Sequence, residues 1–99
     1  MNKRIAVITG AAGGMGREIV ASLIRDGAKC YGLDISKVGL KEMGSTLGTE
    51  FVGIEIDLTK PEKILSSFQQ IEDTEGGMDI LVNNAGTCLM SNFPDVSVA

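Results

Sequence analysis

A cluster of glycines at residues 9–16 has the composition and position of a phosphate-binding turn. It reads Thr-Gly-Ala-Ala-Gly-Gly-Met-Gly and lies between a predicted strand and a predicted helix. The first turn of a helix exposes N–H groups and the positive end of the helix dipole, so a pyrophosphate can bind there if the backbone approaches closely. We predict that Gly10 permits the sharp turn, Gly14 the close approach and Gly16 tight packing of the helix on the strand. The alternative is an ordinary glycine-rich connection, whereas a P-loop is excluded because no Gly-Lys-Ser/Thr follows.

Asp34 is a second residue whose position suits nucleotide binding. It ends the second predicted strand, 18 residues after Gly16. In a nucleotide-binding βαβ unit, an acid at this place accepts hydrogen bonds from the adenosine ribose hydroxyls, and its charge repels a 2′-phosphate. We therefore predict that NAD is preferred over NADP, with Arg17 and Lys37 as the nearby cations that could reverse the preference. The alternative for Asp34 is a loop aspartate beside a helix cap.

Apolar runs alternate with helical patterns along the chain and indicate how these residues are positioned. The four predicted strands are residues 5–8, 28–33, 51–56 and 80–82. Strands separated by helices predict βαβ units, and hence a parallel sheet with right-handed crossovers. We expect one partial α/β domain over residues 1–99: a Rossmann-type, doubly wound sheet with strand order 3-2-1-4, truncated after the fourth strand. The first two helices should cover one face of the sheet and the third helix the other.

Capping residues and apolar periodicity indicate three helices between these strands. Ser36 should cap the second helix, and Thr59 with Glu62 should form a capping box at the start of the third. Gly39 and Gly44 should each weaken the second helix by about 1 kcal/mol relative to alanine. The expected apolar faces are Met15, Ile19, Val20, Leu23 and Ile24 on the first helix, Leu40, Met43 and Leu47 on the second, and Ile64, Leu65, Phe68 and Ile71 on the third.

Composition narrows the possible partners. The net charge of −4 argues against nucleic acid and anionic membranes, and no apolar run approaches the roughly 20 residues of a membrane-spanning helix. Cys30 and Cys88 share no metal-binding or redox spacing, so we expect reduced thiols and a cytoplasmic location. The absence of histidine excludes histidine metal sites and Ser-His-Asp triads, and we predict no metal site.

Three motifs, in order and spacing, resemble the short-chain dehydrogenase/reductase family. The family's cofactor turn has the form Thr-Gly-x-x-x-Gly-x-Gly, which residues 9–16 match at every fixed position. An acid-apolar pair after the third strand is matched by Asp57-Leu58. The family's Asn-Asn-Ala-Gly after the fourth strand is matched by residues 83–86. The resemblance covers the whole chain.

The resemblance implies a set of cofactor contacts. The glycine turn would line the pyrophosphate, and Asp34 with Ile35 would hold the adenosine ribose. Asp57 and Leu58 would contact adenine, although Asp57 could also be an ordinary loop acid before a helix. Residues 84–86 would pass beneath the cofactor ribose, with Asn83 bracing the sheet. The implied cofactor-binding residues are Gly10, Gly14, Met15, Gly16, Asp34, Ile35, Asp57, Leu58, Asn84, Ala85 and Gly86.

The groups that carry the family's chemistry have no counterpart in these residues. That chemistry uses a Ser, an Asn and a Tyr-x-x-x-Lys pair downstream of Asn-Asn-Ala-Gly, whereas Tyr31, the single tyrosine, precedes Ile35 by four residues and is expected to pack in the core. We therefore expect the N-terminal cofactor-binding part of an NAD(P)-dependent oxidoreductase, with no catalysis by these residues alone. The alternatives are a non-catalytic nucleotide-binding module that senses NAD or pairs with a partner, and a methyltransferase. The methyltransferase is disfavoured because no acid precedes the glycines.

The resemblance and the predicted sheet also suggest how the chain associates. Full-length members of the family are usually homo-oligomeric. In these 99 residues the strand at Ile80–Val82 should present an unprotected apolar edge, which invites aggregation. The substrate is unreadable because the family builds that pocket from later residues.

Overall fold

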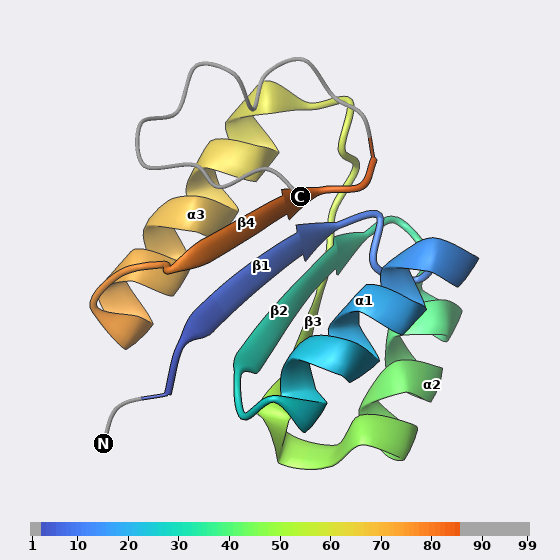
Figure 1. Ribbon diagram of the computed structural model, residues 1–99. Helices are drawn as coiled ribbons and strands as arrows, with labels where there is room; N and C mark the ends of the chain where they lie inside the picture. The colour runs from blue at the N-terminus through green and yellow to red at the C-terminus, as the bar shows by residue number, and fades with distance from the viewer. Residues whose placement is uncertain (1–2, 86–99) are drawn as a thin grey trace.

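The computed structural model describes residues 3–85, which form a four-stranded parallel sheet with strand order β3-β2-β1-β4 (Figure 1). This confirms the predicted α/β class and strand order. The strands are β1 (Ile5–Thr9), β2 (Lys29–Asp34), β3 (Phe51–Glu55) and β4 (Ile80–Asn83). The helices are α1 (Gly14–Arg25), α2 (Lys37–Leu47) and α3 (Pro61–Glu75), with a short 3-10 turn, η1 (Gly48–Glu50), before β3.

The sheet is covered on both faces, so its strands are apolar on both sides. Helices α1 and α2 lie on one face and α3 lies on the other, as predicted (Figure 1). Successive residues of a strand point to opposite faces. Thus Val7 packs with Ile64 and Phe68 of α3, whereas Ile8 packs with Val20 of α1 and with α2. All five residues of β1 are buried, which explains its uninterrupted apolar sequence.

The local signals of the sequence locate most helix ends correctly. The Ser36 hydroxyl caps α2 by accepting a hydrogen bond from the Gly39 N–H at 3.1 Å. Gly76 adopts a left-handed conformation, φ 84°, at the end of α3. The predicted capping box of α3 is wrong, because the N-cap is Lys60 and Pro61 begins the helix. The Thr59 hydroxyl instead donates to a carboxylate oxygen of Asp57, and no side chain caps the start of α3.

Two predicted core residues lie outside the core. Met15, in the first turn of α1, is 68% exposed, because it precedes the part of the helix that crosses the sheet. Leu65 is 52% exposed, because the stripe of α3 that faces the sheet runs through Ile64, Ser67, Phe68 and Ile71. The Ser67 hydroxyl donates to the Lys63 carbonyl at 2.9 Å, which satisfies its polar atom in this buried position.

The two glycines of α2 have different structural roles. A Cβ at Gly39 would lie 2.8 Å from the Ala12 Cβ and 3.0 Å from the Ser36 hydroxyl oxygen, so glycine allows α2 to approach the glycine turn. A Cβ at Gly44 would meet no atom within 4 Å. Both glycines are predicted to lower the stability of α2. Only at Gly39 does close packing explain why glycine is present.

Replacing Gly44 by alanine should therefore stabilise the protein. The substitution restores helix propensity in the interior of α2 without a clash, and it should raise the free energy of unfolding by about 0.5–1 kcal/mol. Urea denaturation followed by circular dichroism measures the change. The matched substitution Gly39→Ala should lower stability, and an equal gain from both variants would contradict this distinction.

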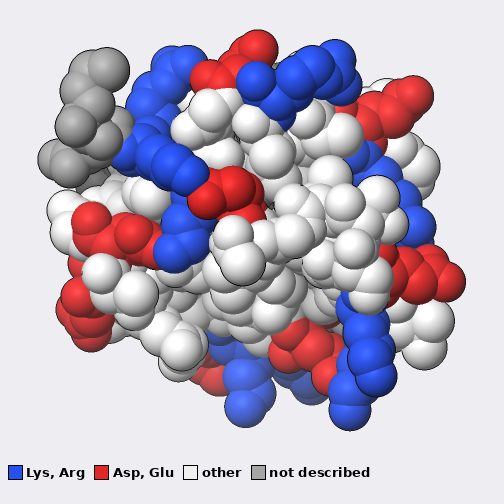
Figure 2. Space-filling model, turned by 90° about the horizontal axis from the view of Figure 1, so that it is seen from below, with Lys and Arg blue, Asp and Glu red and all other residues white. Residues whose placement is uncertain are grey.

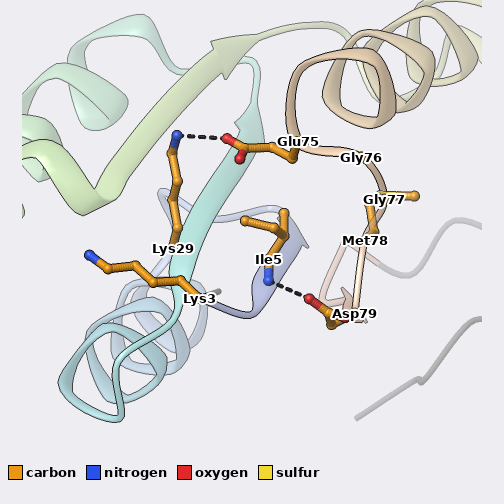
Figure 3. A pocket seen from close by; sticks show the side chains of 8 residues that line it. All are labelled: Lys3, Ile5, Lys29, Glu75, Gly76, Gly77, Met78 and Asp79. Carbon is orange, nitrogen blue, oxygen red and sulfur yellow. Dashed lines mark hydrogen bonds and ion pairs between the residues drawn. The ribbon is translucent and has the colours of Figure 1, made fainter. Parts of the chain in front are cut away.

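At the amino-terminal edge of the sheet, Lys29 and Tyr31 of β2 meet Glu75 of α3 in a small polar cluster. The Tyr31 ring is buried as predicted, and its hydroxyl donates to the Glu75 carboxylate. The same carboxylate pairs with the Lys29 ammonium at 2.6 Å, as Figure 3 shows. The hydrogen bonds from Lys29 and Tyr31 lower the pKa of Glu75. Burial, with the hydrogen bond to Glu75, raises the pKa of Tyr31.

Surface charge, helix length and the cysteines bear on the possible partners of the protein. On the face in Figure 2, lysine and arginine side chains are interspersed with aspartate and glutamate rather than gathered into one patch. Within residues 3–85, none of the helices combines the length and apolar character needed to cross a bilayer. Burial raises the pKa of the free thiol of Cys30 to about 11, whereas Cys88 lies outside the described residues.

Candidate cofactor-binding site

The residues predicted to bind a nucleotide converge at the carboxyl edge of the sheet. In the parallel pairing, Thr9 at the end of β1 lies opposite Leu33 of β2 and Asn83 of β4. Asp34 lies opposite Glu55 of β3. The loops that leave all four strands therefore begin at one edge, beside the start of α1 (Figure 1). In an open parallel sheet this edge is where ligands bind, at the point where the strand order reverses.

The shape of the glycine turn requires glycine at two of its positions, Gly10 and Gly16. Gly10 has φ 68° and donates from its N–H to the Leu33 carbonyl at 2.8 Å, which fixes the turn against β2. A Cβ at Gly16 would lie 2.3 Å from the Gly10 carbonyl oxygen and 2.8 Å from the Ala11 Cα. Gly16 therefore allows α1 to pack against the turn itself, whereas the sequence predicted packing of the helix on the strand.

The start of α1 leaves room for an anion. Its N-cap is Gly13, which provides no side-chain hydrogen bond to the first turn, in contrast to Ser36 at α2. A Cβ at Gly14 would meet no atom within 4 Å. The first N–H groups of α1 thus have no capping side chain from Gly13, and they stand at the positive end of the helix dipole. These residues fit a pyrophosphate, which needs backbone donors and close approach.

Asp34 connects the glycine turn to the start of α2. One carboxylate oxygen, Oδ2, accepts the Ala12 N–H at 3.0 Å, and the other, Oδ1, accepts the Ser36 N–H at 2.9 Å. A carboxylate has about four acceptor positions, so each oxygen can accept a further hydrogen bond. The structure therefore combines the two sequence interpretations of Asp34. It is the last residue of β2, hydrogen-bonded to the residue that caps α2, and it lies half-buried at the edge where a ribose would bind.

The Asn-Asn-Ala segment after β4 is hydrogen-bonded to the glycine turn. The Asn84 side-chain amide donates to the Gly10 carbonyl at 3.0 Å, across 74 residues of sequence. The buried Thr9 hydroxyl lies 3.2 Å from the Asn83 side-chain oxygen and accepts the Ala85 N–H at 3.2 Å. These contacts fix the end of β4 relative to the turn. Gly86, the last residue of the predicted site, lies outside the described residues.

The residues predicted to contact adenine follow β3, at the same edge of the sheet. Fewer hydrogen bonds connect them to the glycine turn than connect Asp34 or Asn84 to it. The Ile56 N–H donates to the Asp34 carbonyl at 3.0 Å, which positions the loop after β3 beside β2. Asp57 accepts both the N–H and the hydroxyl of Thr59, and these hydrogen bonds lower the pKa of its carboxyl. Leu58 packs partly against the core, whereas the Ile35 side chain is 64% exposed.

The structure adds Arg17 to the surroundings of the site in a way that the sequence does not reveal. Its Nε donates to the Ala12 carbonyl at 2.8 Å, and its Nη2 pairs with the Glu42 carboxylate at 3.1 Å. The sequence marks Arg17 only as a nearby cation. The sequence could predict Glu42 only to be an exposed residue of the second helix. Its pairing with Arg17 depends on how α1 and α2 pack.

The fold and the hydrogen-bonded turn define a Rossmann-type dinucleotide-binding unit. A family model for short chain dehydrogenases matches residues 4–99. The chain therefore belongs to the short-chain dehydrogenase family, and it corresponds to the family's N-terminal, cofactor-binding part. Among curated proteins it is similar to the 3-oxoacyl-acyl-carrier-protein reductase FabG of Salmonella typhimurium, with 41% identity over 84% of this chain and 34% of that protein. The FabG of Vibrio cholerae is 40% identical over the same shares.

Solved structures give the same relationship. A 3-ketoacyl-(acyl-carrier-protein) reductase from Brucella melitensis, complexed with NADH, superposes with a TM-score of 0.74 at 26% identity, over 80% of this chain and 33% of that one. Serine dehydrogenase from Escherichia coli superposes with a TM-score of 0.74 at 28% identity, over 81% and 37%. The chain thus spans about a third of the length of the relatives it matches.

Proposed function

We propose that this chain is the adenine-nucleotide half of the cofactor site of an NAD-dependent oxidoreductase. One observation carries the proposal: Asp34 is hydrogen-bonded to the glycine turn at 3.0 Å, so a carboxylate stands directly beside the open start of α1. A dinucleotide whose pyrophosphate occupies the helix start would bring its adenosine ribose to this carboxylate.

The roles of the individual residues follow from their positions. Gly14 and the first N–H groups of α1 would bind the pyrophosphate, and the free acceptor positions of Asp34 would receive the ribose hydroxyls. Met15 and Ile35 expose apolar side chains at this edge, which a nucleotide would cover. Asp57 with Leu58 would contact adenine, and residues 84–86 would support the second ribose.

The charge at Asp34 is the reason for proposing NAD rather than NADP. A 2′-phosphate carries close to two negative charges and would stand beside a carboxylate that already accepts two backbone hydrogen bonds. Both repulsion and the loss of the ribose hydroxyl as a donor disfavour NADP there.

For the complete enzyme we propose hydride transfer between nicotinamide and an alcohol or carbonyl substrate. The names of the curated relatives, which reduce a 3-oxoacyl group, support this reaction type. The described residues contain no Tyr-x-x-x-Lys pair, and the Tyr31 hydroxyl is committed to Glu75 at the opposite edge of the sheet. The chain's own contribution is therefore to bind and orient the dinucleotide.

We also make proposals for the cellular location of the protein and for its assembly. We propose that the protein works in the cytoplasm, supported by the free, buried thiol of Cys30, which is typical of a reducing compartment. We also propose that the longer members of the family assemble as homo-oligomers. For the 99-residue chain itself we propose a tendency to aggregate, because strand β4 pairs only with β1 among the described residues and an open strand edge favours association.

Thermal unfolding in the presence of different cofactors tests the proposal. A ligand at one hundred times its Kd stabilises the folded state by about 2.7 kcal/mol. We expect NAD to raise the melting temperature of the chain, NADP to do so only at higher concentration, and S-adenosylmethionine to have no effect. Stabilisation by S-adenosylmethionine alone, or by none of the three, would refute the assignment.

A further inference from the structure

The corner where α1, α2 and the end of β2 meet contains a charge pair beside the predicted ribose site. Arg17 of α1 donates from Nε to the Ala12 carbonyl at 2.8 Å, while the Ala12 N–H donates to Asp34 at 3.0 Å. One residue of the glycine turn is thus held by both the guanidinium and the carboxylate. The Arg17 side chain is 42% exposed, so its charge can reach a ligand at this corner.

The tight packing at Gly39 shows how near the guanidinium lies to the start of α2. The Cβ position of Gly39 is 3.1 Å from the Arg17 Nη2 and 3.0 Å from the Ser36 hydroxyl oxygen. Ser36 in turn donates its N–H to Asp34. The Arg17 guanidinium and the Ser36 hydroxyl thus lie on either side of Gly39, and Ser36 is hydrogen-bonded to Asp34, the carboxylate that would receive the adenosine ribose in the proposed complex.

Glu42 determines whether the positive charge of Arg17 is available there. Its carboxylate pairs with Nη2 at 3.1 Å across the gap between α1 and α2. The pair holds Nη2 of Arg17 beside α2, and the negative charge of Glu42 offsets part of the positive charge of the guanidinium. Without that pairing, Arg17 would present a planar cation of the kind that binds phosphate.

We propose that the Arg17–Glu42 pair is a second determinant of cofactor choice, acting together with Asp34. Glu42 is a positioning residue that withholds Arg17 from a 2′-phosphate, so that NADP meets the Asp34 charge without compensation. This inference rests on the proposed function. Beyond that function, it states that the preference for NAD depends on Glu42, a residue of α2 that does not touch the cofactor.

The substitution Glu42→Gln tests the inference in the full 99-residue chain, through Kd values for NAD and NADP from competition titration. The variant should lower the ratio of the NADP Kd to the NAD Kd about three- to fivefold, the size expected for an exposed charge pair. The shift should disappear at high ionic strength, because salt screens exposed charges. A double variant, Arg17→Gln with Glu42→Gln, should return the ratio to that of the unaltered chain.

Glu72→Gln is the matched control, since it removes the same charge from an exposed position on α3, on the other face of the sheet. It should leave the ratio unchanged. Binding of NAD by the unaltered chain, with no change of the ratio in Glu42→Gln, would overturn this inference and leave the proposed function standing. Binding of neither dinucleotide by the unaltered chain would refute both. An equal shift in Glu72→Gln would show a general charge effect and would also overturn the inference.

Discussion

Replacing Gly16 by alanine should destabilise the fold more than any other single-methyl substitution in the glycine turn. The added Cβ would lie 2.3 Å from the Gly10 carbonyl oxygen and 2.9 Å from the Ala11 carbonyl carbon. Both are backbone atoms, so the turn or the helix must move to relieve the clash. We expect the free energy of unfolding to fall by about 2–3 kcal/mol, which exceeds the gain of about 1 kcal/mol in helix propensity. Urea denaturation measures the loss.

Gly14→Ala is the matched substitution for Gly16→Ala, two residues earlier in the same turn of α1. A Cβ at Gly14 meets no atom of residues 3–85 within 4 Å, so stability should be unchanged or slightly higher. The methyl group would nevertheless occupy the space where the pyrophosphate approaches, so the affinity for NAD should fall. The two variants separate a glycine that the fold needs from one that the ligand needs. A Gly16→Ala variant as stable as the unaltered chain would refute the packing argument.

The features that the sequence predicted correctly are those with short-range causes. The continuous apolar run of β1 follows from burial on both faces, and the Ser36 cap follows from a hydroxyl three residues before a free N–H. The strand order follows from alternating strands and helices, because right-handed crossovers leave few arrangements. Such signals survive folding because tertiary contacts reinforce them.

The predictions that failed were decided by competition between neighbouring groups. Thr59 was expected to cap α3, but a charged acceptor two residues earlier, Asp57, takes both its N–H and its hydroxyl. Leu65 was expected in the core, but the narrow contact between α3 and the sheet buries Ser67 instead. Sequence propensity alone could not show that Lys60 rather than Thr59 is the N-cap of α3, or that Ser67 rather than Leu65 is buried.

The contacts that complete the candidate site join residues that are far apart in sequence. Asn84 reaches the Gly10 carbonyl across 74 residues, and Arg17 reaches Glu42 across 25. The family motifs indicated that the two segments belong to one site, but not that they are hydrogen-bonded to each other. Only the packing of β4 against β1, and of α1 against α2, brings these atoms together.

The largest effect on cofactor binding should come from Asp34, because its carboxylate holds the glycine turn and, in the proposed complex, receives the adenosine ribose. Replacing it by asparagine keeps the size of the side chain and one acceptor oxygen, but it removes the charge and one of the two hydrogen bonds to Ala12 and Ser36. Losing charge-assisted hydrogen bonds to two ribose hydroxyls should weaken NAD binding about 10- to 100-fold. Titration with NAD and NADP, followed by fluorescence or calorimetry, measures both affinities.

The ratio of the two affinities in Asp34→Asn distinguishes ribose recognition from a purely structural role. If Asp34 only fixed the glycine turn, both dinucleotides would weaken equally, because both need the same turn for their pyrophosphate. If Asp34 receives the ribose, NAD should weaken while NADP weakens less or binds better, because the repulsion of the 2′-phosphate is gone. Asp26→Asn, at the far end of α1, removes the same charge away from the site and should change neither affinity. A parallel loss of both dinucleotides in Asp34→Asn would assign this carboxylate to the fold alone.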